Sequence, residues 1–181
     1  MLDHLSRVEQ RRKIIAIFDR DVPKVVGEIE KDGPIKDYGN SVFAFCLPIP
    51  LGRKDYTNIS IEFFYKDHDL KKEKSGKCLY FDNELRLETP LSDRSEKILI
   101  RMEASRVQNE FSKKVYDENL GDLSWIHSKS RFADLVENDA EFAKGIDFED
   151  FRQIFDRMKV IIENRVQVVQ REVGARAAGE I

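Results

Sequence analysis

Two continuous apolar runs in the first third of the chain predict buried β-strands. The first is IIAIF at residues 14–18, and the second is SVFAFCLPIP at residues 41–50. Short apolar runs bounded by charge or proline are typical of strands covered on both faces of a parallel sheet. The segment between them starts near Pro23 and ends near Gly33, as a helix does. Strand, helix and strand in this order predict a right-handed crossover between two parallel strands.

Apolar residues at three- and four-residue steps predict helices near both ends of the chain. The longest covers residues 147–173, with Asp147 as its N-cap, and a second covers residues 130–143. A further helix is predicted over residues 2–12, with Leu2, Leu5 and Val8 on one side.

The middle of the chain gives weaker patterns. Residues 58–70 fit either a strand or the start of a short helix, and residues 77–81 fit a strand. Residues 82–97 are polar and predict a loop, while residues 98–103 fit a strand or a helix start. Together the patterns predict an α/β fold with a short, mainly parallel sheet, flanking helices and a C-terminal helical tail. We expect residues 1–103 to form the α/β core and residues 104–181 a mostly helical extension packed on it.

The composition narrows the functional classes. Of 181 residues, 41% are hydrophobic and 36% are charged, yet the net charge is only −3. This balance argues against binding nucleic acid by charge alone, so such binding needs a local basic patch or a bridging metal. The two cysteines, Cys46 and Cys78, form no CxxC pair. With no signal-peptide pattern and no membrane-length apolar run, we expect a cytoplasmic protein without membrane contact.

The end of the first strand carries the strongest candidate chemistry. Asp19 and Asp21 directly follow IIAIF, and alternation along an extended segment points both carboxylates the same way. Ligands of open parallel sheets gather beyond the carboxyl ends of strands, and two carboxylates can hold Mg²⁺ with its remaining waters. The intervening Arg20 would then point elsewhere. An equally weighted interpretation makes Asp21 a helix cap and Asp19 a polar strand end.

The stretch KIIAIFDRDVPKVV, followed by VFAFCLPIP, resembles the later half of a TOPRIM domain. TOPRIM domains are the Mg²⁺-binding domains of topoisomerases, bacterial primases and OLD-family nucleases. In this resemblance Asp19 and Asp21 match the family's DxD motif at the end of its third strand. The likeness is greatest to OLD-family and phage-defence TOPRIM nucleases, and it implies hydrolysis of nucleic acid with Mg²⁺ or Mn²⁺, with DNA ranked ahead of RNA as the substrate.

Two more positions extend the resemblance. Glu62 in ISIEFF matches an acidic residue after the DxD strands, and Lys129 in WIHSKSRFADLV matches a terminal lysine. The resemblance implies that Asp19 and Asp21 hold one metal and that Glu62 helps to hold a second. The metals would activate water and stabilise the leaving oxygen, while Lys129 would neutralise charge on the phosphate.

One element of the TOPRIM pattern is not matched. The family's first glutamate ends a strand that precedes the DxD motif, whereas Glu9 lies on the predicted helix 2–12. We therefore expect a TOPRIM-like core without its opening strands, in a fragment or as one half of a split site. A missing upstream domain or partner chain would supply the rest.

Two other interpretations remain open. A strand that ends in DxD also opens the haloacid-dehalogenase-like phosphatases, in which the first aspartate, here Asp19, is the nucleophile. Alternatively, the chain is a non-catalytic module for partner binding or oligomerisation. An open sheet edge and the aromatic face of the helix 147–173 favour that second interpretation.

Overall fold

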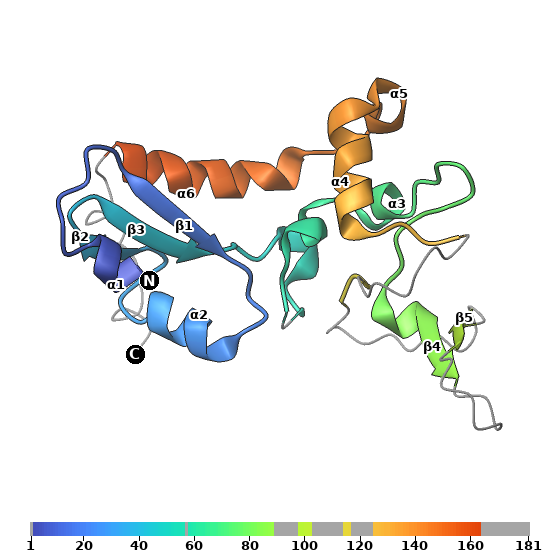
Figure 1. Ribbon diagram of the computed structural model, residues 1–181, viewed down its shortest axis with the longest axis horizontal. Helices are drawn as coiled ribbons and strands as arrows, with labels where there is room; N and C mark the ends of the chain where they lie inside the picture. The colour runs from blue at the N-terminus through green and yellow to red at the C-terminus, as the bar shows by residue number, and fades with distance from the viewer. Residues whose placement is uncertain (1, 57, 89–97, 103–113, 117–124, 164–181) are drawn as a thin grey trace. The chain divides into compact units, whose positions relative to one another are not determined.

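The computed structural model describes residues 2–56, 58–88, 98–102, 114–116 and 125–163 (Figure 1). Contacts group them into two compact units. The sheet unit takes in the described residues of the ranges 1–54, 59–61 and 149–181. The aromatic unit takes in those of the ranges 55–58 and 62–148. The predicted domains, 1–103 and 104–181, stay a prediction, because their boundary lies outside the described residues.

The two predicted strands of the sheet unit are present and parallel. Strand β1 (Ile14–Phe18) pairs with β3 (Val42–Cys46) from Ile14 opposite Val42 to Phe18 opposite Cys46. Helix α2 (Pro23–Ile29) lies between them in the sequence. The predicted crossover of two parallel strands is therefore confirmed, and the chain is a mixed α/β protein.

An additional strand, β2 (Lys36–Gly39), pairs antiparallel with β3. The connecting turn is tight, since Asn40 and Ser41 both take positive φ, at 47° and 65°. A register shift between Asp37 and Gly39 marks a bulge. The sheet order is β1-β3-β2, so the sheet is mixed rather than the mainly parallel one that the sequence predicts.

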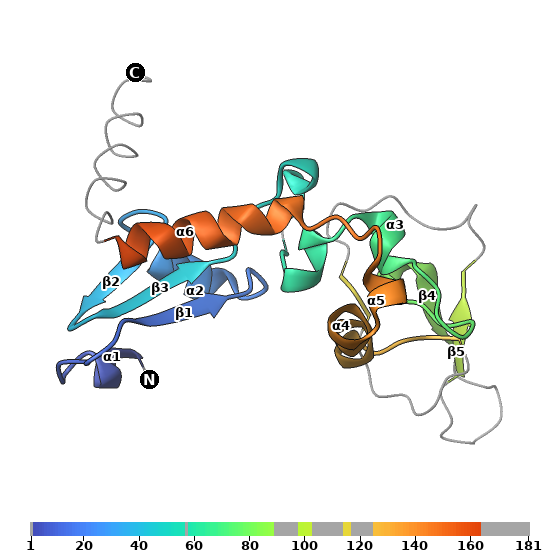
Figure 2. The same cartoon turned by 90° about the horizontal axis from the view of Figure 1, so that it is seen from above.

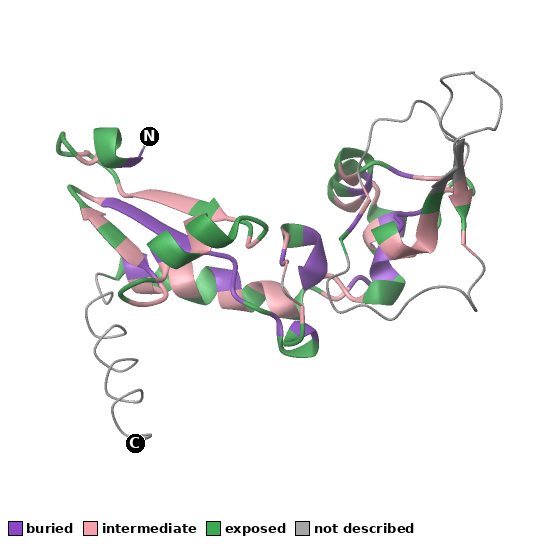
Figure 3. Cartoon of the chain, turned by 90° about the horizontal axis from the view of Figure 1, so that it is seen from below, coloured by how far each residue is buried: buried purple, intermediate pink, exposed green. Residues whose placement is uncertain are grey.

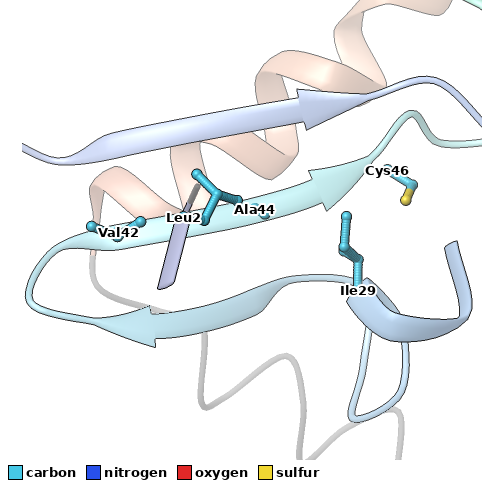
Figure 4. Packing of buried hydrophobic residues seen from close by; sticks show 5 residues of the cluster. All are labelled: Leu2, Ile29, Val42, Ala44 and Cys46. Atoms are coloured by element: carbon cyan, nitrogen blue, oxygen red, sulfur yellow. The ribbon is translucent and has the colours of Figure 1, made fainter. Parts of the chain in front are cut away.

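The core of the sheet unit lies on both faces of β3, which is buried along its whole length (Figure 3). On one face, β3 packs with α1 (Leu2–Leu5) and α2. Figure 4 shows that cluster, made of Leu2, Ile29, Val42, Ala44 and Cys46. Helix α6 (Arg152–Ile162) runs along the other face, as Figure 2 shows. Both faces of the central strand are therefore covered, as its continuous apolar run predicts.

Two predicted helices of the sheet unit differ in extent. Helix α1 ends at Leu5 instead of residue 12, and Val8 is 66% exposed rather than packed. Helix α6 begins at Arg152 after a 3₁₀ turn at Glu149–Phe151. Asp147 is therefore not its N-cap, and the predicted residues beyond 163 lie outside the described part of the chain. A further 3₁₀ turn follows β3 at Leu51–Arg53.

The aromatic unit is built around packed rings rather than a large sheet. Phe132 contacts Tyr65 and Phe142 edge to face, at centroid distances of 5.2 and 5.8 Å. Its helices are α3 (Asp67–Leu70), α4 (Lys129–Asn138) and α5 (Ala140–Ala143), and its 3₁₀ turns include Ile61–Phe64 and Asp82–Glu84. Its paired strands are β4 (Leu85–Glu88) and β5 (Ile98–Arg101).

Three predictions for the aromatic unit need correction. Residues 85–88 form β4, although the polar segment 82–97 predicts a loop. Residues 77–81 make only isolated bridges instead of a strand. The helix predicted over 130–143 breaks at Asp139, because its carboxylate accepts the main-chain N–H of Phe142 and starts α5.

Candidate functional site

Asp19 and Asp21 lie in the loop that joins the end of β1 to α2. Both residues are exposed. Val22 occupies the N-cap position of α2, with no side-chain cap, and Pro23 stands in the first turn. The interpretation of Asp21 as the helix cap is therefore wrong, and its carboxylate is not used to start α2.

Arg20, between the two aspartates, turns into the sheet unit. Its Nη1 and Nη2 atoms donate to Oε1 and Oε2 of Glu30, each at 2.7 Å, and Nη1 also donates to the carbonyl of Leu47 at 3.2 Å. The side chains of Arg20 and Glu30 are only 14% and 24% exposed. The bidentate contact with Glu30 raises the pKa of Arg20. The guanidinium of the DxD segment is thus paired inside the unit.

Arg157 of α6 joins the same network from the other side. Its Nη1 donates to the carbonyl oxygens of Cys46 at 2.8 Å and Pro34 at 3.3 Å, and it lies 3.8 Å from Oε1 of Glu30. Burial lowers the pKa of Arg157, while the Glu30 carboxylate opposes that shift. Burial likewise raises the pKa of the Cys46 thiol, so Cys46 stays protonated rather than becoming a thiolate ligand.

The other two predicted site residues, Glu62 and Lys129, meet in the aromatic unit. Lys129 Nζ lies 3.2 Å from Glu62 Oε1, and the two side chains are 21% and 12% exposed. Glu62 stands on the 3₁₀ turn rather than on a strand. Lys129 opens α4 next to Ser128, whose hydroxyl accepts the N–H of Arg131 at 3.1 Å. The structure thus pairs Glu62 with Lys129, whereas Asp19 and Asp21 belong to the sheet unit.

Two further polar groups of the aromatic unit, Tyr65 and Asp69, are half-buried and buried respectively. Burial raises the pKa of Tyr65, and the charges of Glu62 and Asp69 act in the same direction. Asp69 is 3% exposed, and its Oδ2 accepts the main-chain N–H of Asp147 at 3.2 Å. Asp69 thus contributes a buried structural carboxylate.

One histidine that the sequence does not single out is buried in the aromatic unit. His127 is 7% exposed, and its Nε2 atom has no hydrogen-bond partner within the described residues. Burial lowers its pKa, and the positive charges of Arg131 and Lys77 add to that effect. His127 is therefore neutral near pH 7. No sequence spacing marks it, because its burial comes from tertiary packing.

The described residues contain no group of three or more His, Cys, Asp or Glu side chains placed to hold a metal ion. Any cation on Asp19 and Asp21 would take its other ligands from water or substrate, as Mg²⁺ commonly does. None of the helices in the described ranges is long and apolar enough to cross a membrane.

Comparisons with protein-family models, with curated proteins and with solved structures find no match for this chain. The resemblance to TOPRIM domains therefore rests on the sequence motifs alone.

Proposed function

We propose that this chain is a TOPRIM-type domain of a metal-dependent nuclease, in which Asp19 and Asp21 hold Mg²⁺ or Mn²⁺. The observation that supports the proposal most is their position. The two carboxylates are exposed at the carboxyl end of β1, one of two parallel strands. That end of a parallel sheet is where ligands of α/β proteins bind.

The chemistry of these residues fits a hard divalent cation. Carboxylate oxygens are the ligands that Mg²⁺ and Mn²⁺ prefer, and exposed carboxylates let the ion keep several waters. Arg20 is directed to Glu30. Its guanidinium is therefore engaged away from the cation.

The bound cation would supply Lewis acidity toward a phosphodiester and activate a water molecule. Asp19 and Asp21 would orient that cation. Glu62 as a second metal ligand and Lys129 as a partner for the phosphate remain part of the proposal. Both roles require their 3.2 Å ion pair to open, because each group neutralises the other. The substrate is nucleic acid, DNA rather than RNA, in the cytoplasm, where Cys46 and Cys78 stay reduced.

Hydrolysis of labelled DNA and RNA, each single- and double-stranded, tests the proposal. We expect cleavage with Mg²⁺ or Mn²⁺, loss of cleavage in EDTA, and at least about a hundredfold loss in Asp19→Asn/Asp21→Asn. Asp32→Asn is the matched control, because Asp32 is also exposed in the sheet unit. Cleavage that persists in the double variant contradicts the metal site. A wild-type chain that cleaves nothing and whose Mn²⁺ affinity is unchanged in Asp19→Asn/Asp21→Asn contradicts the nuclease and favours the partner-binding module.

A further inference from the structure

The two edges of the three-stranded sheet differ sharply. Edge strand β2 carries Lys36 and Asp37 and contains a bulge, features that discourage pairing with another strand. Edge strand β1 reads IIAIF, contains no charge or bulge, and pairs only with β3 among the described residues. Ile17 of this strand is 42% exposed. The β1 edge therefore lacks the protection that the β2 edge has.

The hydrogen-bond pattern shows which main-chain groups point to the open edge. The Ile14 N–H donates to the Ser41 carbonyl, and the Phe18 carbonyl accepts the Leu47 N–H, both at 2.8 Å. The main-chain N–H and C=O groups of the even-numbered residues of β1 thus face β3. Since alternate residues of a strand point to opposite sides, the N–H and C=O groups of Ile15 and Ile17 face away from β3.

Charge is distributed asymmetrically about this strand. Arg11 and Arg12 precede it, and Asp19 and Asp21 follow it. Lys13 lies next to the strand as well, but its Nζ donates to the carbonyl oxygens of Ile161 and Ile162 at 2.6 and 2.7 Å. Arg20, between these two aspartates, is turned into the unit, where it pairs with Glu30. A strand with a basic start and an acidic end is complementary to an antiparallel copy of itself.

We propose that the β1 edge pairs antiparallel with β1 of a second copy of this chain, about a two-fold axis at Ala16. In this register Ile15 lies opposite Ile17 of the other copy, and their outward main-chain groups exchange hydrogen bonds. The small Ala16 meets itself at the axis. Arg11 lies nearest Asp21 of the other copy, and the exposed part of Ile17 packs on Ile15.

The proposal does not require nuclease activity, but it shares Asp21 with the proposed cation site. Its test therefore uses the full chain in EDTA, so that no cation occupies Asp21. Sedimentation equilibrium of the wild type should show a monomer–dimer equilibrium. In the two-fold dimer, Arg11→Glu or Asp21→Lys places two side chains of the same charge opposite each other at both 11–21 contacts. Each variant should therefore self-associate about tenfold more weakly. An equimolar mixture of the two variants should associate like the wild type, because opposite charges again face each other in the heterodimer.

A second variant probes the main-chain pairing. Ile17→Pro removes an N–H that faces the open edge and leaves the β1–β3 hydrogen bonds in place, so it should lower self-association at least about tenfold. Ile17→Val is the matched control, and circular dichroism checks that each variant is folded. A wild type that stays monomeric overturns the proposal and leaves the edge to a different partner. Association that is no stronger in the charge-swapped mixture than in either variant alone overturns it as well.

Discussion

The acidic residues that are predicted to bind metal differ in environment between the sheet unit and the aromatic unit. In the sheet unit, Asp19 and Asp21 are exposed, and the arginine between them is paired with Glu30. In the aromatic unit, Glu62 is 9% exposed and lies 3.2 Å from Lys129. One unit presents carboxylates to solvent, whereas the other neutralises its carboxylate internally.

This difference decides which carboxylates are available to a cation from solution. A cation at Glu62 must displace an ammonium group that already compensates the partly buried charge, which opposes binding. A cation at Asp19 and Asp21 meets carboxylates that are exposed to solvent, and it keeps several of its waters. The exposure of a carboxylate in the fold therefore matters as much as its position in the sequence motif.

The largest expected effect comes from removing the arginine that ties α6 to the sheet. Arg157→Leu leaves the carbonyls of Cys46 and Pro34 without their donor and Glu30 with one partner fewer. We expect a loss of about 3 kcal/mol in the free energy of unfolding, measured by urea denaturation.

Arg152→Leu is the control for that experiment, because Arg152 is an exposed residue at the start of the same helix. Its effect should stay within about 0.5 kcal/mol. Equal losses in the two variants would show that the network of Arg20, Glu30 and Arg157 does not stabilise the sheet unit.

A double-mutant cycle measures the pairing in the aromatic unit. Glu62→Gln and Lys129→Met each remove one charge of a partly buried pair. We expect a coupling free energy of about 1–2 kcal/mol between them by urea denaturation. Strictly additive losses would mean that the pair is not formed in solution, which would remove the contrast between the two units.

The pH dependence of stability tests the buried histidine of the aromatic unit. Burial lowers the folded-state pKa of His127 from its ordinary value of 6.5, so the unfolded chain takes up a proton more readily. The stabilising contribution is therefore complete above about pH 6.5 and is lost as the pH falls through the folded-state pKa.

We expect His127→Gln to flatten the fall in urea midpoint between pH 7.5 and 5.5, an effect smaller than that of the ion-pair variants. His4→Gln is the control for the loss of an imidazole, because His4 is exposed. An unaltered slope in His127→Gln would mean that His127 titrates as in the unfolded chain.

The smallest effect on stability is expected at the candidate cation site. Asp19→Asn/Asp21→Asn changes two exposed carboxylates in a loop, so the free energy of unfolding without metal should change by less than about 0.5 kcal/mol. Thermal unfolding in EDTA measures this. A large loss would assign these aspartates a structural role in holding the loop.

The sequence predicts the parts of the sheet unit that depend on local apolar pattern. The runs that contain β1 and β3 are continuous and apolar, and both are strands, paired parallel. Strand β2 is not predictable in this way, because KDYG has no apolar pattern. Its conformation comes from pairing with β3 through the turn at Asn40 and Ser41.

The candidate site shows the same limit. The exposure of Asp19 and Asp21 at a strand end follows from the apolar run before them. The pairing of Glu62 with Lys129 joins residues far apart in the sequence, so only the fold reveals it. Asp147 is of a residue type that often caps helices. Its main-chain N–H, however, donates to Asp69, and α6 begins later, at Arg152.

Binding of Mn²⁺, followed by isothermal titration calorimetry, tests the central claim most directly. We compare the wild type with Asp19→Asn/Asp21→Asn and with the matched control Asp32→Asn. We predict that the wild type and the control bind Mn²⁺ alike and that the double variant binds at least about tenfold more weakly. Unchanged affinity in the double variant would contradict the assignment of Asp19 and Asp21 as the cation ligands.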